Sequence, residues 1–153
     1  MKNLPVAKDA AILILRLALG VIFVMHGSQK VFGLFGGEGL QATVQHFQTN
    51  LGIPPLLGYT AAFTEFFGGI ALVVGFLTRL AALGIGITMA VATWKAHLAH
   101  GFFINWSCAQ GQSHGYEYNL ALLAMSLALV LTGGGACSLD SKFCPCESRQ
   151  GSK

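Results

Sequence analysis

Apolar residues dominate the chain from Ala10 to Thr132, and short polar or glycine-rich segments divide them into blocks. A helix that crosses the hydrocarbon core of a bilayer, about 30 Å thick, needs about 20 such residues, with a range of roughly 17–25. Four blocks fit this requirement: residues 10–32, 56–76, 80–98 and 118–131, of which the last is short. The pattern therefore predicts an all-α fold, an integral membrane four-helix bundle.

A shorter amphipathic segment lies between the first two blocks, bounded by glycines before it and by Pro54 and Pro55 after it. Within residues 39–51, the apolar side chains recur at helical spacing, at Leu40, Val44, Phe47 and Leu51. One apolar face on an otherwise polar helix is typical of a helix that lies in the membrane interface. We expect a short amphipathic interfacial helix here, on the outer surface.

The composition supports an integral membrane protein of one domain. Hydrophobic residues make up 54% of the 153 residues and charged residues 10%, whereas soluble domains are about 25% charged. So little polar surface cannot coat a soluble globule. We divide the chain into an N-terminus of residues 1–9, a four-span domain of residues 10–132, and a flexible tail of residues 133–153 that contains cysteines.

Basic residues are unevenly distributed between the two ends of the predicted spans. One end has Lys2, Lys8, Arg16, Arg79, Lys142, Arg149 and Lys153, whereas the other has only Lys30 and Lys95. Cytoplasmic segments of membrane proteins carry the excess of lysine and arginine. Both termini are therefore predicted to be cytoplasmic. The net charge of +3 reflects this topology, and we predict no nucleic-acid partner.

A carboxylate within the second span is the first candidate for function, because an ionisable group is costly inside a membrane. Glu65 has the small residues Ala61 and Gly69 four positions away on either side, so this stripe is expected to face another helix. At a rise of 1.5 Å per residue, Glu65 lies about 15 Å deep and Arg16 about 9 Å from the inner boundary. Glu65 is expected to contact Arg16, or the layer of His26 and Lys30 above it.

Two interpretations of this polar group remain open. In the first, Arg16 and Glu65 form an ion pair that fixes helix packing. In the second, His26, Lys30, Glu65 and Arg16 bind a quinone-like headgroup, with His26 and Glu65 as catalytic residues that bind or relay protons, since a carbonyl needs hydrogen-bond donors and its reduction needs protons. The second interpretation predicts a cavity between spans one and two that is lined by Phe23, Phe63 and Phe66.

The histidines and cysteines allow a different chemistry. His97 and His100 lie three positions apart at the outer end of the third span, a spacing at which two imidazoles can share copper or zinc. They can equally be solvated interfacial side chains. Cys137, Cys144 and Cys146 lie in the tail, where they can bind a soft metal, cycle as thiols, or be ordinary cytoplasmic thiols.

Four motifs together resemble the DoxX family, also called DoxX/DoxD-like, of small four-helix bacterial membrane proteins. They are Leu15-Arg16-Leu17-Ala18-Leu19-Gly20, His26-Gly27-Ser28-Gln29-Lys30, Glu65-Phe66-Phe67-Gly68-Gly69 and Gly75-Phe76-Leu77-Thr78-Arg79-Leu80-Ala81-Ala82. The resemblance covers about residues 10–132. It implies a four-span fold in the bacterial inner membrane and a redox-linked function, because the family name derives from a thiosulfate:quinone oxidoreductase subunit.

The sequence therefore favours a small redox-associated membrane protein with a quinone-like or other small-molecule site between its helices. It contains no redox centre, so we expect a non-autonomous oxidoreductase subunit if it takes part in catalysis. The expected partners are the lipid bilayer and either further copies of the chain or another membrane protein. The alternatives are a non-enzymatic protein that handles metal or small solutes, and a structural subunit of a larger complex.

The predicted topology can be tested by thiol labelling of intact spheroplasts. Cys108 lies in the predicted outer loop and Cys144 in the predicted cytoplasmic tail. A membrane-impermeant maleimide is expected to modify Cys108 and to leave Cys144 unmodified until the membrane is permeabilised. Modification of Cys144 in sealed spheroplasts would refute the topology.

Overall fold

The computed structural model describes residues 4–107 and 113–143, so Cys108, Cys144 and Cys146 lie outside the described residues. All regular secondary structure in this part of the chain is helical. The elements are α1 (Leu4–Phe32), η1 (Leu34–Gly36), α2 (Leu40–Leu51), α3 (Pro55–Val74), α4 (Thr78–Ala92), η2 (Thr93–His97), η3 (Leu98–His100), α5 (Glu117–Thr132) and α6 (Leu139–Phe143).

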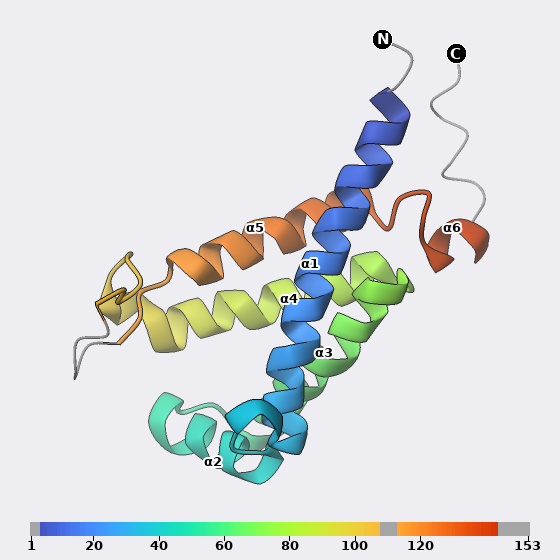
Figure 1. The fold of residues 1–153 in the computed structure, drawn as a ribbon. Coiled ribbons are helices and arrows are strands. Elements are labelled where there is room, and N and C mark those ends of the chain that lie inside the picture. The colour runs from blue at the N-terminus through green and yellow to red at the C-terminus, as the bar shows by residue number, and fades with distance from the viewer. Residues whose placement is uncertain (1–3, 108–112, 144–153) are drawn as a thin grey trace.

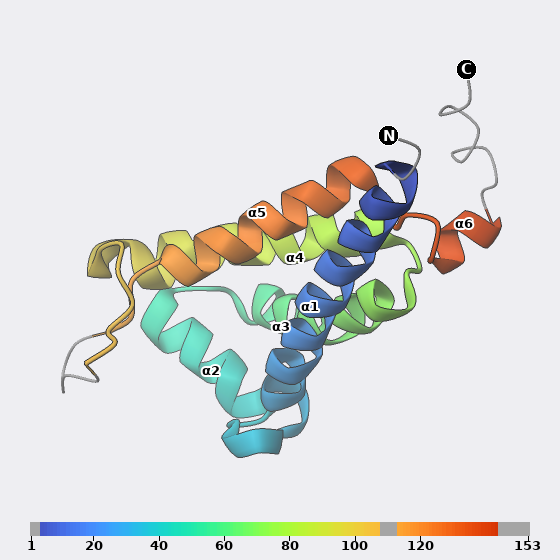
Figure 2. The same ribbon diagram turned by 45° about the horizontal axis from the view of Figure 1, so that its top comes forward.

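The four longer apolar helices form two pairs. α1 packs mainly against α3, and α4 packs mainly against α5. The pairs approach each other at the end where α1 begins and α6 lies, and they diverge towards the other end (Figures 1 and 2). Large buried side chains from both pairs, including Leu19, Phe23, Leu72, Ile85 and Leu129, fill the core between them.

Two of the four predicted spans have the length and composition needed to cross a membrane, namely Val6–Phe32 and Pro55–Val74. α4 and α5 contain 15 and 16 residues, and 16 residues of α-helix measure about 24 Å. Helical backbone continues beyond α4 through a π-helical turn, η2, and a 3-10 turn, η3, to His100. The all-helical prediction is confirmed, whereas a bundle with four membrane spans stays a prediction.

Glycines bring α1 and α3 into direct backbone contact. A Cβ atom on Gly69 would lie 2.6 Å from the Val24 amide nitrogen, and one on Gly20 would lie 2.9 Å from the Gly69 carbonyl oxygen. Only glycine permits this approach. The expectation that the stripe through Glu65 and Gly69 faces another helix is therefore confirmed, and that helix is α1.

The amphipathic helix is confirmed as α2, but protein covers its apolar face. Val44 is 5% exposed, and a Cβ on Gly58 of α3 would lie within 3.6 Å of both Val44 and Phe47. Gly39 precedes the helix and Gly52 follows it, both with positive φ. α2 therefore packs on α3 with its polar face exposed, instead of inserting its apolar face into lipid.

The segment after α5 was predicted to be part of a flexible tail, but residues 133–143 contact three other elements. The Asp140 carboxylate accepts hydrogen bonds from the backbone amides of Leu77 (2.7 Å) and Thr78 (2.9 Å) at the start of α4. The Asp140 amide donates to the Gly75 carbonyl at 2.9 Å, and the Ala136 amide donates to the Asp9 carboxylate at 3.1 Å. These partners are distant in sequence, so local composition gave no sign of them.

Close packing of α1 on α3 predicts a different response at two neighbouring positions. Gly20 has no room for a side chain, because its Cβ would lie 2.8 Å from a methyl group of Val73, whereas Ala18 is exposed. Gly20→Leu is expected to destabilise the protein by about 1–3 kcal/mol, the usual cost of overpacking, and Ala18→Leu is expected to be neutral. Thermal unfolding in detergent measures both, and equal unfolding temperatures would contradict the packing.

Candidate functional site

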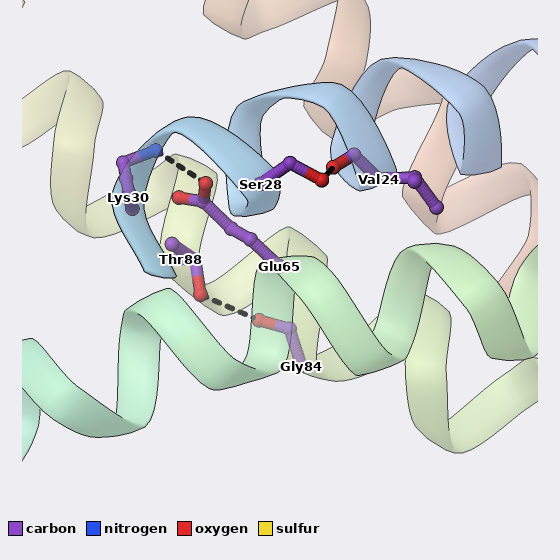
Figure 3. A network of polar contacts seen from close by, with 6 residues as sticks. All are labelled: Val24, Ser28, Lys30, Glu65, Gly84 and Thr88. Atoms are coloured by element: carbon purple, nitrogen blue, oxygen red, sulfur yellow. Dashed lines mark hydrogen bonds and ion pairs between the residues drawn. The ribbon is translucent and has the colours of Figure 1, made fainter. Parts of the chain in front are cut away.

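Glu65 and Lys30 form an ion pair between α3 and the last turn of α1 (Figure 3). Glu65 is 2% exposed, and it is the only buried acidic residue in the part of the chain that the structure describes. The Lys30 side chain is 24% exposed. One partner is thus enclosed by protein, while the other reaches from the buried carboxylate to the molecular surface.

Backbone packing positions this pair. A Cβ on Gly27 would lie 2.5 Å from the Phe66 backbone, so the end of α1 lies directly against the residue that follows Glu65. Two neighbouring hydroxyl groups are satisfied within their own helices (Figure 3): Ser28 donates to the Val24 carbonyl at 2.6 Å, and Thr88 donates to the Gly84 carbonyl at 3.0 Å.

A cleft of about 350 Å³ lies beside Lys30, between the end of α1, the following turn and α2. We call it the α2 cleft; it is lined by Gln29, Lys30, Gly36, Gly37, Glu38, Thr43, His46 and Phe47. Lys30 therefore belongs both to the buried ion pair and to the wall of an open cleft.

Gln29 holds the turn that forms one side of the α2 cleft. Its carbonyl accepts hydrogen bonds from the amides of Gly33 (3.1 Å) and Gly39 (3.3 Å), and its side-chain amide donates to the Phe35 carbonyl at 3.2 Å. A Cβ on Gly37 would lie 2.3 Å from the Gln29 carbonyl oxygen. Because the turn folds back this tightly onto α1, it holds the start of α2 beside Lys30.

The cleft does not have the lining that the sequence predicted. Phe23 is 1% exposed and belongs to the core. Phe63 and Phe66 are part of a ladder of aromatic rings with Phe32 and Phe67, in which neighbouring centroids are 5.1–6.1 Å apart. These rings pack on one another, whereas the α2 cleft lies by the turn after α1 and has Phe47 as its only aromatic ring besides the imidazole of His46.

His26 lies on α1 one turn before Lys30 and is exposed. The charges of Lys30 and Glu65 both act on its ring. The structure therefore places three of the predicted residues, His26, Lys30 and Glu65, in one region. The same region contains three further residues that the sequence had not indicated as site residues, Gln29, Thr43 and His46. They lie on either side of a glycine-rich turn, and that position in the sequence could have indicated a site.

Arg16 does not join this region, which corrects the expectation that it pairs with or supports Glu65. It is 2% exposed, and its guanidinium donates to the carbonyls of Gly134 (2.6 Å) and Cys137 (2.7 Å). A Cβ on Gly75 would lie 2.6 Å from the guanidinium. Arg16 and Lys30 are separated by about 21 Å along α1, at 1.5 Å per residue. Arg16 instead binds carbonyls of the segment between α5 and α6.

The predicted metal pair is not assembled into a larger ligand set. The His97 Nδ1 atom contacts the His114 carbonyl at 2.9 Å, whereas His100 is exposed and lines a second cleft with Phe103 and Trp106. Within residues 4–107 and 113–143, no three histidine, cysteine or acidic side chains come together to hold a metal ion. The metal prediction thus gains no support here.

Two helices in the described part of the chain are long and apolar enough to cross a membrane, and a buried ion pair joins them. The DoxX family profile matches residues 11–98, and the chain belongs to the DoxX family. This confirms the family that the motifs indicated.

Three relatives from bacteria cover most of the chain. A Haemophilus influenzae protein named "Uncharacterized protein" is 31% identical over 94% of this chain and 98% of its own length. "Putative oxidoreductase CatD" of Bacillus subtilis is 30% identical over 84% of this chain and 83% of its own length. "Inner membrane protein YqjF" of Escherichia coli is 31% identical over 87% of this chain and 92% of its own length. No solved structure matches the chain.

The ion pair makes a prediction that a double-mutant cycle can test. Lys30→Met leaves the Glu65 carboxylate buried without its partner, which typically costs about 3–5 kcal/mol. Lys30→Met combined with Glu65→Leu removes both charges and is expected to recover most of that loss. Unfolding of the two single variants and the double variant in detergent gives the coupling energy. Additive effects of the two substitutions would show that the residues are not paired.

Proposed function

We propose that this protein is a redox-associated subunit of the bacterial inner membrane and that it binds a quinone-type headgroup beside Lys30 and Glu65. In this proposal all four apolar helices cross the bilayer, and both termini are cytoplasmic. The headgroup occupies the α2 cleft near the outer surface, and the apolar tail of the ligand extends into lipid.

One observation carries the proposal: Lys30 contacts the buried Glu65 carboxylate and also lines the α2 cleft. An ammonium group has three donors, so one hydrogen bond to Glu65 leaves capacity for a carbonyl acceptor in the cleft. The carboxylate lies directly behind that donor. Only the Lys30 side chain therefore separates a ligand carbonyl at this position from the buried Glu65 carboxylate, which can accept a proton.

The chemistry follows from this order of groups. Reduction of a quinone to a quinol takes two electrons and two protons. In this proposal Lys30 gives a hydrogen bond, and then a proton, to the carbonyl oxygen that gains charge. The Glu65 carboxylate first accepts a proton and then passes it to the neutral Lys30 amine. The second proton reaches the other carbonyl oxygen from solvent at the open cleft. His26 is the neighbouring titratable group through which protons reach this layer. The electrons come from a partner subunit that holds a redox centre.

The relatives support this assignment through their names alone. The Bacillus subtilis protein is named as an oxidoreductase and the Escherichia coli protein as an inner membrane protein. An oxidoreductase without a redox centre of its own requires a redox partner. We therefore extend to this chain the role of a non-autonomous subunit, as the sequence had indicated.

A structural subunit is the second candidate. The Lys30–Glu65 pair joins α1 to α3, and this contact needs no ligand to explain it. The two functions differ in what happens when the pair is replaced by apolar residues. A structural pair is replaceable without loss of function, whereas a headgroup site is not.

Binding of a short-chain quinone analogue tests the proposal. The variant that combines Lys30→Met with Glu65→Leu is expected to remain folded and to bind the analogue at least about tenfold more weakly, because a hydrogen bond to a charged donor is worth roughly 1.5–3 kcal/mol. Lys95→Met is the matched control, since Lys95 is exposed beside Trp94. Extraction of the purified wild type is expected to release quinone. Unchanged affinity in the folded double variant would favour the structural role.

A further inference from the structure

The α2 cleft has a second wall that the proposed function does not use. Gln29 and Lys30 form the wall that belongs to α1, whereas Thr43, His46 and Phe47 form the wall that belongs to α2. His46 is an exposed residue of α2. The cleft therefore has a nitrogen-bearing side chain on each side, Lys30 on one wall and His46 on the other.

The side chain of Asn50 lies next to the His46 ring and favours one of its two neutral tautomers. The Asn50 side-chain nitrogen lies 3.1 Å from His46 Nδ1, and an amide nitrogen is a donor only. Nδ1 is then the acceptor, so the neutral ring carries its hydrogen on Nε2. Because Asn50 lies one turn after His46 on the same helix, this contact needs no other part of the protein.

α2 is held so that this ring stays at the cleft. Val44 and Phe47 pack against Gly58 of α3, and the Phe47 ring meets the His46 ring edge-on, with centroids 6.4 Å apart. Gly39 and Gly52 have positive φ at the two ends of the helix. His46 is therefore carried by a helix whose apolar face is fixed.

The charges around the cleft favour a neutral ligand. The Lys30 charge is balanced by Glu65, and Glu38 places a further carboxylate on the lining. A phosphate, sulfate or carboxylate ligand would approach Glu38 without an unbalanced cation to offset the repulsion. A ligand with carbonyl acceptors and no net charge can accept hydrogen bonds from Lys30 and His46 and is not repelled by Glu38.

From these observations we infer that His46 is a second ligand-binding residue. One carbonyl of a neutral para-quinone binds Lys30, and the other carbonyl accepts a hydrogen bond from Nε2–H of His46. Asn50 is its positioning residue, because it holds the tautomer that donates. The two carbonyls of a para-quinone lie on opposite sides of its ring, which suits two donors that come from different helices, α1 and α2. This inference rests on the proposed function and extends it to the ligand class.

Three variants and a control measure the contribution of the ring. His46→Leu is expected to weaken binding of the quinone analogue about fivefold to tenfold, the effect of one hydrogen bond. His46→Gln keeps a donor and is expected to recover part of that loss, and Asn50→Leu is expected to weaken binding less than His46→Leu. His114→Leu is the control, because the His114 side chain is exposed outside the α2 cleft.

Nitrogen NMR of histidine-labelled protein provides a readout that a purely structural role would not change. In the wild type, His46 is expected to show the tautomer with hydrogen on Nε2, and in Asn50→Leu a mixture of both tautomers. A wild-type ring protonated on Nδ1, or no tautomer change in Asn50→Leu, would refute the role of Asn50.

The outcomes separate this inference from the proposed function. Binding by the wild type, loss in the double variant of Lys30 and Glu65, and unchanged binding in His46→Leu would overturn the inference alone. No binding of the analogue by the wild type would overturn the proposed function and the inference with it. Tighter binding of a carboxylate-bearing analogue than of the neutral one would overturn the assigned ligand class.

Discussion

Neutralisation of the Glu65 carboxylate inside an apolar helix pair is the constraint on which the end of the structure that holds α2 depends. A buried ion without a partner costs several kcal/mol, so the last turn of α1 must stay where Lys30 reaches Glu65. That placement sets the start of the turn that Gln29 holds. This turn fixes the position of α2. The α2 cleft is the space between the end of α1, the turn and α2.

The end of the structure that holds α6 meets the same requirement with backbone groups. Arg16 is as buried as Glu65, and its guanidinium binds the carbonyls of Gly134 and Cys137 just after α5. These carbonyls belong to the segment between α5 and α6, so backbone oxygens outside the helices bind the arginine. Asp140 completes this arrangement with hydrogen bonds to the first amides of α4. α1 is therefore fixed at its middle by Arg16 and at its last turn by Lys30, and the two charges have different partners.

Much of the fold could be predicted from the sequence, because it depends on local patterns. Apolar blocks and the spacing of Val44 and Phe47 indicated the helices, and the small residues around Glu65 indicated a helix contact. The partners of Arg16 were not predictable, because backbone carbonyls have no sequence signature and Gly134 is 118 positions away. The α2 cleft escaped prediction for a related reason: it arises from how a glycine-rich turn folds back on Gln29.

The central claim is that a ligand carbonyl in the α2 cleft and the Glu65 carboxylate share Lys30. Difference infrared spectroscopy of the wild type, recorded on addition of a quinone analogue, tests this most directly, with Glu65→Gln identifying the bands of Glu65. If Lys30 is shared, binding alters the hydrogen bond to Glu65, and its carboxylate bands shift when the analogue binds. Full occupancy of the site with no change in the Glu65 bands would contradict the account.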